Sequence, residues 1–407
     1  MIVQAAAWVV FLLTYLGVAT GRLPGFRLDR AGVALLGAAL MVGLGVVSLD
    51  EAYRAIDWNT IVLLLGTMIV VAHLRSSGAF ASLIDWAAAR VTTPLGLLAL
   101  ILGVSAVASA FLVNDTVCLV LAPAVLDLTR RLGCKPIPYL LGLAVASNIG
   151  SVATITGNPQ NMIIGSASGI TYLNFAQALT PAAGVGLVMA FLLLWLLYRD
   201  ELHGRLGTPP AAIRRRGLPR LNRLSIIVTL AMIVGFFVID PVAKPAILAA
   251  AVLFLVGGVK PKRIYGAIDW SLLLMFAGLF VVTAAIEKIA LTPDVLARIA
   301  ILPLGNIPLL TVVAAVLSNL VSNVPAVLLL KPFVAGLPQP HAGWLCLAMA
   351  STLAGNFTVV GSVANIIVVE KAVQSGVVIT LGSYFRLGAP LTLLTLLTGI
   401  LVLQLRG

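Results

Sequence analysis

The sequence predicts an all-α membrane protein that crosses the bilayer many times. Of its 407 residues, 61% are hydrophobic and 10% are charged, whereas soluble domains average about 45–50% apolar and about 25% charged residues. The apolar residues form continuous runs, unlike the alternating strands of a transmembrane β-barrel. A third observation is an internal repeat, in which polar segments of the first half recur in the second. The composition excludes a cytosolic enzyme, a disordered scaffold and a nucleic-acid-binding protein.

The apolar runs predict about ten transmembrane helices and two further hairpins. The first run lacks a basic start, so it predicts a spanning helix rather than a cleaved signal. The run at 246–259 is short for a span. Seven runs suit single crossings: 2–21, 29–48, 58–74, 178–198, 222–239, 246–259 and 268–286. Five others are 94–129, 137–166, 300–330, 342–369 and 378–405.

The basic residues lie mainly in short connections, so the net charge of +12 indicates positive-inside topology rather than nucleic-acid binding. The most basic connection, 200–221, is rich in proline and is predicted to be a cytoplasmic linker. The Asp50–Glu51 connection then lies on the opposite side. If 94–129 enters and leaves on one face, each half crosses five times and the N-terminus lies outside. Several basic residues share the side of the linker, among them Arg22, Arg27 and Arg30.

Three segments of the first half recur in the same order in the second. The pairs are 56–58 with 268–270, 109–123 with 318–332, and 143–164 with 347–368. Chance similarity between leucine-rich helices is disfavoured because the matched residues include Ser, Thr, Gly and Asn. An odd number of crossings inverts the second copy, and inverted repeats are typical of secondary transporters. We expect a first repeat over 1–199, the linker over 200–221 and a second repeat over 222–407.

Two repeat-related polar segments predict re-entrant hairpins. Asn114, Asp115 and Thr116 lie midway in 94–129, where a straight helix would be about 50 Å long against a bilayer core of about 30 Å. Folding at Asn114–Asp115 gives two shorter helices. The counterpart Ser322–Pro325 predicts a second hairpin over 300–330, with Pro325 in the first turn of its outgoing helix.

Two further polar segments predict broken helices. Thr156–Asn161 interrupts 137–166, and Gly355–Asn365 interrupts 342–369, with Gly, Asn and Pro residues that end helices. Irregular backbone persists in hydrocarbon only where it lines protein or water. Ordinary kinks packed by small residues are the alternative, but the pairing by the repeat favours a central binding cavity.

Helix ends would supply the chemistry of this cavity. Free amides at helix starts favour oxyanions or polar solutes, whereas free carbonyls at helix ends suit Na⁺. No Arg or Lys lies centrally in an apolar run, so a multiply charged substrate would rely on dipoles and co-bound cations. The candidate substrate- and ion-binding residues are Asn114, Asp115, Thr116, Ser147, Asn148, Thr156, Gly157, Asn158, Asn161, Ser318, Ser322, Asn323, Gly355, Asn356, Gly361, Ser362 and Asn365.

Asp115 is the candidate for proton coupling. A charged carboxylate in the membrane interior is costly and marks function by default, although the side chain could merely cap the outgoing helix. Its repeat counterpart is Val324, so any charge coupling is asymmetric. Asp57 and Asp269 precede Trp at helix starts and are predicted to be N-terminal caps.

The remaining reactive side chains carry weaker signals. Cys118 follows Asp115 by one turn and could meet a metalloid, but a small buried cysteine is more common. His73 is predicted to be a packed or interfacial residue. The three cysteines match neither a disulfide framework nor a metal spacing. We therefore expect no cofactor and no resident metal, only a coupling H⁺ or Na⁺.

These motifs resemble the ion transporter superfamily, which includes arsenite permeases, citrate and divalent-anion symporters of the SLC13 type, and D-type sodium/proton antiporters. The resemblance covers nearly the whole chain and is most specific at 111–117, 147–161 and 355–365. The chain is similar above all to the arsenite and anion permease branch, whose Asn-Asp pair falls on Asn114 and Asp115. The symporter branch shows Ser-Asn-Thr at both tips, from which this chain departs.

The resemblance implies an elevator-like movement in a multi-pass inner membrane protein that exports arsenite, antimonite or a related inorganic anion against proton entry. It also implies a cytoplasmic ATPase subunit in some members, and a homodimer is compatible with it. The alternatives are a Na⁺-coupled anion or dicarboxylate symporter and a Na⁺/H⁺ antiporter. A passive channel and a membrane-embedded enzyme are remote alternatives, the latter because no catalytic motif is present.

Overall fold

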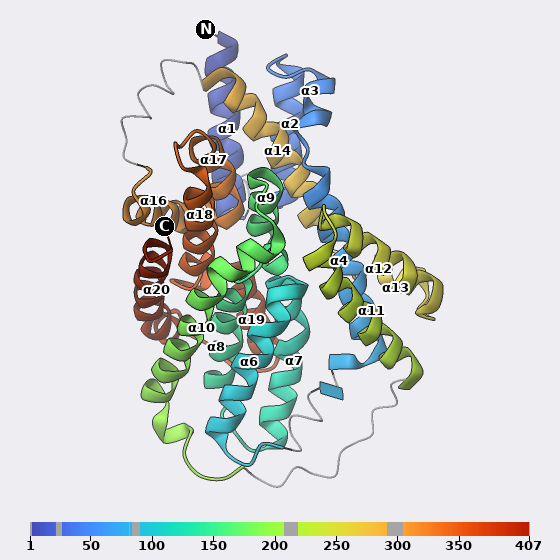
Figure 1. Ribbon diagram of the computed structural model, residues 1–407, viewed down its shortest axis with the longest axis vertical. Coiled ribbons are helices and arrows are strands. Elements are labelled where there is room, and N and C mark those ends of the chain that lie inside the picture. Colours follow the sequence, from blue (N-terminus) through green and yellow to red (C-terminus); the bar gives the residue numbers. More distant parts are fainter. Residues whose placement is uncertain are drawn as a thin grey trace.

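The computed structural model describes residues 2–21, 27–80, 82–83, 90–206, 219–290 and 304–406. Every regular element in these ranges is helical (Figure 1), which confirms the all-α class. Among the described residues, six helices are long and apolar enough to cross a membrane, and six shorter apolar helices accompany them. Most of the predicted linker, including 207–218, lies outside the described residues.

The first half begins with α1 (Ile2–Thr20), α2 (Arg30–Gly43), α3 (Leu49–Ala55) and α4 (Trp58–Ser77). It continues with α6 (Pro94–Leu112), α7 (Asn114–Arg131), α8 (Ile137–Ser151), η1 (Ile155–Gly157), α9 (Pro159–Ser168), α10 (Tyr172–Leu197) and η2 (Arg199–Glu201).

The second half repeats this order of helices. It begins with α11 (Pro219–Val238), α12 (Ala243–Val256), α13 (Pro261–Tyr265) and α14 (Trp270–Ala290). It continues with α16 (Ile307–Val321), α17 (Asn323–Ala335), α18 (Pro340–Ala354), η3 (Val359–Gly361), α19 (Val363–Gln374) and α20 (Leu381–Gln404).

The predicted helix caps are confirmed. Asp57 accepts hydrogen bonds from the amides of Asn59 and Thr60 at the start of α4. Asp269 accepts one from Leu272 at the start of α14, with an N···O distance of 3.0 Å. Both carboxylates therefore satisfy helix amides that have no partner within their own helix.

The segments 94–129 and 300–330 both contain helical hairpins. Ser105 of α6 and Leu121 of α7 line one small cavity, although a straight helix would separate them by about 24 Å. Likewise, Leu310 of α16 and Val334 of α17 both lie against Gly343. Figure 1 places α6 and α7 below the centre of the molecule and α16 and α17 above it. Their re-entrant position in a bilayer stays a prediction.

The turn of the first hairpin lies one residue earlier than the predicted Asn114–Asp115. Val113 has a φ angle of 62° and joins α6 to α7, and Ser322 has a φ of 77° and joins α16 to α17. They are the described non-glycine residues with positive φ, and they occupy the same repeat position. A non-glycine residue held at positive φ stores strain of about 1–3 kcal/mol. Asn114 is consequently the first helical residue and not the turn.

The helices pack as two bodies with a pseudo-twofold relation. The flanking body contains α1–α4 and α11–α14, and the central body contains α6–α10 and α16–α20. Within the flanking body, α2 packs on α14 while its counterpart α12 packs on α4. Within the central body, α7 packs on α19 while α17 packs on α9. Such reciprocal contacts are the property of a twofold arrangement.

Candidate functional site

The two broken helices are held open by equivalent asparagines. The Nδ2 of Asn161 donates to the carbonyls of Ser151 and Thr154, both at 3.0 Å. The Nδ2 of Asn365 donates to the carbonyls at the equivalent positions, Gly355 at 2.8 Å and Thr358 at 3.2 Å. The Thr154 and Thr358 carbonyls also accept from the backbone amides of Gly157 and Gly361, whereas the asparagines supply a partner for the Ser151 and Gly355 carbonyls at the breaks. A buried carbonyl without a partner is costly. The predicted breaks are thus confirmed, together with the reason that they persist.

The two broken helices contact each other through two hydrogen bonds that the repeat makes equivalent. The Nδ2 of Asn158 donates to Thr352 Oγ1 at 3.1 Å, and Ser362 Oγ donates to Asn148 Oδ1 at 3.0 Å. Ser362 is the counterpart of Asn158, and Thr352 is the counterpart of Asn148. The sequence repeat is therefore also a spatial repeat at the centre of the molecule.

Asn148 is the centre of a buried amide network. Its Nδ2 donates to Asn356 at 2.8 Å and to Asn365 at 3.0 Å. Its Oδ1 accepts from Asn114 at 2.9 Å and from Ser362. Because all four hydrogen-bonding positions of the amide are used, Asn148 fastens the first hairpin tip to the broken helix of the second half.

A small central pocket lies where the hairpin tips and the broken helices meet. Its volume is about 40 Å³, far below the roughly 300–1,000 Å³ of sites for drug-sized ligands. Five of the predicted residues line it: Asn114, Asp115, Ser322, Asn323 and Ser362. The other lining residues are Val18, Arg30, Pro159, Gln160, Leu272, Met275, Phe276, Val324, Pro325 and Val363.

No Arg or Lys lies centrally in an apolar run, but a basic residue at the end of one run lies at the central pocket. Arg30, expected with the basic connections, lines the pocket together with Asp115. It is the first residue of α2, and packing of α2 against α1 and α14 brings this helix start to the pocket. Hydropathy places such a residue at the end of a run, but it does not show which other helices meet that end.

Asp115 is half-buried and faces several elements. Its carboxylate accepts a hydrogen bond from the backbone of Ala364 near the start of α19, and Asp269 and, more weakly, Arg30 act on it electrostatically. Asp115 does not cap its own helix through a described hydrogen bond, because α7 has no side-chain cap. The pocket therefore has an acceptor next to helix amides and a guanidinium.

Both tips carry an unused acceptor. The Oδ1 atoms of Asn114 and Asn323 are buried and have no hydrogen-bond partner among the described residues, and the same holds for the hydroxyls of Ser109 and Ser318. Each of these is a repeat-related pair. Buried polar atoms are nearly always bonded, so the tips would gain from a solute or ion that satisfies the asparagine oxygens.

Other predicted site residues lie behind the pocket. Ser147 accepts a hydrogen bond from Cys118 Sγ at 3.0 Å, which places this thiol in the protein core. Thr156 bonds to the hydroxyl of Tyr172 at 2.7 Å. Asn356 Nδ2 donates to the Val145 carbonyl at 3.4 Å. These residues shape the breaks, whereas Thr116 is half-buried on α7.

Two of the predicted glycines are required by close backbone approach. A Cβ at Gly157 would lie 2.1 Å from the carbonyl oxygen of Ser151, and one at Gly361 would lie 2.9 Å from that of Gly355. The two glycines, and the two carbonyls that they approach, occupy equivalent positions in the repeat. A Cβ at Gly355 would lie 3.2 Å from Asn323 Nδ2, so this glycine makes room for the second tip.

His73 is a packed residue, as predicted. It is 1% exposed, its Nδ1 pairs with the Ile69 carbonyl at 2.9 Å, and its ring lies edge-on to Phe254. It does not line the central pocket. Its position between α4 and α12 favours a structural role.

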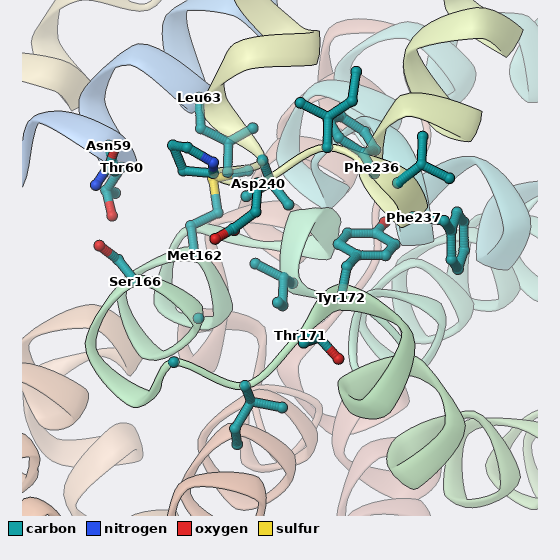
Figure 2. A pocket seen from close by; sticks show the side chains of 18 residues that line it. Asn59, Thr60, Leu63, Met162, Ser166, Thr171, Tyr172, Phe236, Phe237 and Asp240 are labelled. Carbon is teal, nitrogen blue, oxygen red and sulfur yellow. The ribbon is translucent and has the colours of Figure 1, made fainter.

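A larger cavity of about 440 Å³ lies between the flanking body and α9 (Figure 2). Thr60 and Leu63 line it, and their repeat counterparts Leu272 and Met275 line the central pocket. Phe236, in the last turn of α11, corresponds in helix order to Val18 in the last turn of α1. The two cavities thus use equivalent ends of the flanking helices, but Asp240 borders the larger cavity and Arg30 the smaller.

A solved transporter named YdaH from Alcanivorax borkumensis shares the fold, with a TM-score of 0.62, 15% identity and coverage of 99% of this chain and 98% of that one. The fold and its two pseudo-symmetric breaks have the inverted-repeat architecture that is typical of secondary transporters.

The sequence model of the citrate transporter (CitMHS) family matches residues 9–354. The chain belongs to this family, within the ion transporter superfamily that the motifs indicated. A transporter from Mycobacterium tuberculosis is 34% identical over 93% of this chain and 94% of its own. The silicon efflux transporter LSI3 of rice is 30% identical over 93% of both chains, and the arsenical pump membrane protein of Escherichia coli is 27% identical over 92% of both.

Proposed function

We propose that this transporter exports a small metalloid hydroxide, such as arsenous, antimonous or silicic acid, in exchange for protons, or a related small inorganic anion by proton-coupled transport. The observation that carries the proposal is the central pocket, in which one carboxylate, one guanidinium and two unused amide oxygens surround a space of about 40 Å³. Relatives named for silicon efflux and for an arsenical pump support this choice of solutes.

The pocket chemistry suits a compact solute with several hydroxyl groups. The Oδ1 atoms of Asn114 and Asn323 would accept two of its hydrogens, and the ionised Asp115 would accept a third. The first turns of α17 and α19 offer amides to its oxygens. A tricarboxylate such as citrate has too much volume and charge for this pocket in the described conformation.

Proton exchange follows from the use of Asp115 as an acceptor. An ionised carboxylate accepts a hydrogen bond from the solute, and a protonated one presents a hydrogen in its place. Proton and solute therefore compete for one position, so a proton arriving from outside displaces the solute. Competition at a single site is the physical requirement for exchange of two substrates.

Movement of the central body against the flanking body would expose the pocket alternately to the two sides. The reciprocal packing within each body, with fewer contacts between bodies, supports an elevator-like movement. In this proposal the protein spans the inner (plasma) membrane of the cell. Its N-terminus lies outside, and the linker 200–221 lies in the cytoplasm.

Transport by the purified protein in vesicles tests this function. We expect an imposed pH gradient to drive accumulation of arsenite, antimonite or silicic acid without sodium. Sulfate, phosphate, succinate and citrate serve as the comparison solutes. Accumulation of a carboxylate that requires sodium, with no response to the pH gradient, would contradict proton-coupled metalloid export.

A sodium-coupled symporter is the second candidate function, and the unused asparagine oxygens favour it. Amide oxygens at Asn114 and Asn323, with the carbonyls that end α6 and α16, are ligands of the kind that Na⁺ accepts. In that case sodium alone would raise the thermal stability of the protein, and the effect would saturate. A matched titration with potassium is the control.

A further inference from the structure

The flanking body lines one side of the central pocket with apolar residues of α1 and α14, and it also supplies a cation there. Arg30 begins α2, and a Cβ at Gly21 would lie 3.6 Å from its Nε. Gly21, just after α1, thus lies beside the Arg30 side chain. The preceding residue, Asp29, is the N-terminal cap of α2, and its Oδ1 accepts the Gly32 amide at 2.9 Å. No described ion pair includes Arg30.

The charged group across this pocket is Asp115. It lies on the hairpin tip of the central body, and Arg30 lies on α2 of the flanking body. The other charge acting on Asp115 is the Asp269 carboxylate at the start of α14, which is engaged with the Leu272 amide. Asp269 does not line the pocket, whereas Arg30 and Asp115 line it together. Without Arg30, Asp115 would meet only a like charge.

We propose that Arg30 is a positioning residue for proton coupling, since it neutralises the Asp115 carboxylate and so keeps that group ionised until a proton arrives. This inference rests on the proposed function. With Asp115 ionised, the pair has no net charge and accepts a neutral hydroxide; with Asp115 protonated, the pocket carries one positive charge. The pair therefore links solute release to proton uptake.

The same charge balance predicts which solutes exchange with protons and which travel with them. A neutral metalloid hydroxide needs ionised Asp115 and competes with the proton. A monoanion is favoured beside Arg30 only when Asp115 is protonated, so it binds together with the proton. Arg30 thereby makes exchange specific for neutral hydroxides. The larger cavity lies on the pseudo-symmetric side, and its described lining residues include the carboxylate of Asp240 but no Arg or Lys.

Infrared titration of the purified protein tests the inference without any solute. The carbonyl band of a protonated carboxylic acid is followed against pH and assigned to Asp115 by its loss in Asp115→Asn. In Arg30→Gln we expect the midpoint of this band to move to higher pH by about one unit, a tenfold change in proton affinity, because an opposite charge has been removed. Arg30→Lys should retain most of the wild-type midpoint.

Arg27→Gln is the matched control, because it removes a positive charge from an exposed residue outside the pocket. An unchanged midpoint in Arg30→Gln, or an equal movement in Arg27→Gln, would overturn the role of Arg30. So would the absence of a band that depends on Asp115. Failure of metalloid transport with the expected midpoint shift would instead contradict the proposed function alone. Thermal unfolding of each variant confirms that it is folded.

Discussion

The two hairpin tips share one backbone and differ in chemistry. Both turn at a residue with positive φ, and both begin the outgoing helix with an asparagine that has an unused oxygen. The next residue is Asp115 in the first tip and Val324 in the second. Asn114 is bonded to Asn148, whereas Asn323 packs against Gly355. Backbone geometry is thus duplicated by the repeat, and the charged chemistry is confined to one copy.

The largest expected effect comes from erasing this difference. Asp115→Asn should reduce transport driven by a pH gradient by about tenfold or more, because a titratable group inside the membrane is lost. Vesicle uptake under an imposed gradient measures it. Full gradient-driven transport in this variant would exclude coupling through Asp115. Adding Val324→Asp sharpens the comparison, since it shows whether a carboxylate on the second tip restores coupling.

The next effect compares the two halves of the buried contact. Asn148→Ala removes a fully bonded amide and leaves partners in both halves unsatisfied, so we expect a loss of about 2–4 kcal/mol in stability. Thr352→Ala removes the acceptor of Asn158 and Gln160 and should cost about 1 kcal/mol. Thermal unfolding in detergent measures both. Equal losses would mean that Asn148 does not hold the centre together.

The paired glycines give a third comparison. Gly157→Ala should destabilise the protein by about 2 kcal/mol or more, because its Cβ would meet backbone atoms that cannot move independently. Gly361→Ala should cost less, since the nearest carbonyl oxygen is farther away. The midpoints of thermal unfolding compare them. A larger loss for Gly361→Ala would contradict the geometry described.

The turn residues should respond in the opposite direction. Ser322→Gly should raise stability by up to about 1 kcal/mol, because glycine adopts positive φ without strain. Val113→Gly should gain less, since Val113 is 1% exposed and its side chain contributes to the core. Thermal unfolding of the two variants decides between strain and packing. Equal gains would show that Val113 packing contributes little.

The smallest effect concerns an ion pair of the flanking body that the repeat does not duplicate. Glu51 on α3 lies 2.7 Å from Lys288 Nζ, and this hydrogen-bonded partner holds the pKa of Glu51 below its usual value. The repeat counterparts are Arg263 and Ser76. A carboxylate whose pKa is lowered by folding stabilises the protein at pH values above its ordinary pKa. This stabilisation is lost as the pH falls through the lowered pKa of the folded state. Glu51→Gln should slightly lower the unfolding temperature at neutral pH, with the difference fading as acidification protonates Glu51.

Much of the fold could be predicted from the sequence because membrane helices obey local rules. Continuous apolar runs set the helices, and Gly, Asn and Pro set the breaks at η1 and η3. The equivalence of Asn161 and Asn365 follows from the repeat offset, and their identical carbonyl contacts confirm it. The turn at Val113 was displaced by one residue because a β-branched apolar residue at positive φ has no local signal.

The sequence by itself determined the class, the spans, the paired interruptions and the single unmatched carboxylate, since each depends on neighbouring residues or on comparison of the two halves. Only the tertiary structure decided that Arg30 joins Asp115 in one pocket and that Ser147 and Thr156 remain behind it. The physical reason is that a helix end meets partners that are distant in the chain. Hydropathy indicates the depth in the membrane at which a residue can lie. Only the packing of helices determines which side chains come into contact at that depth.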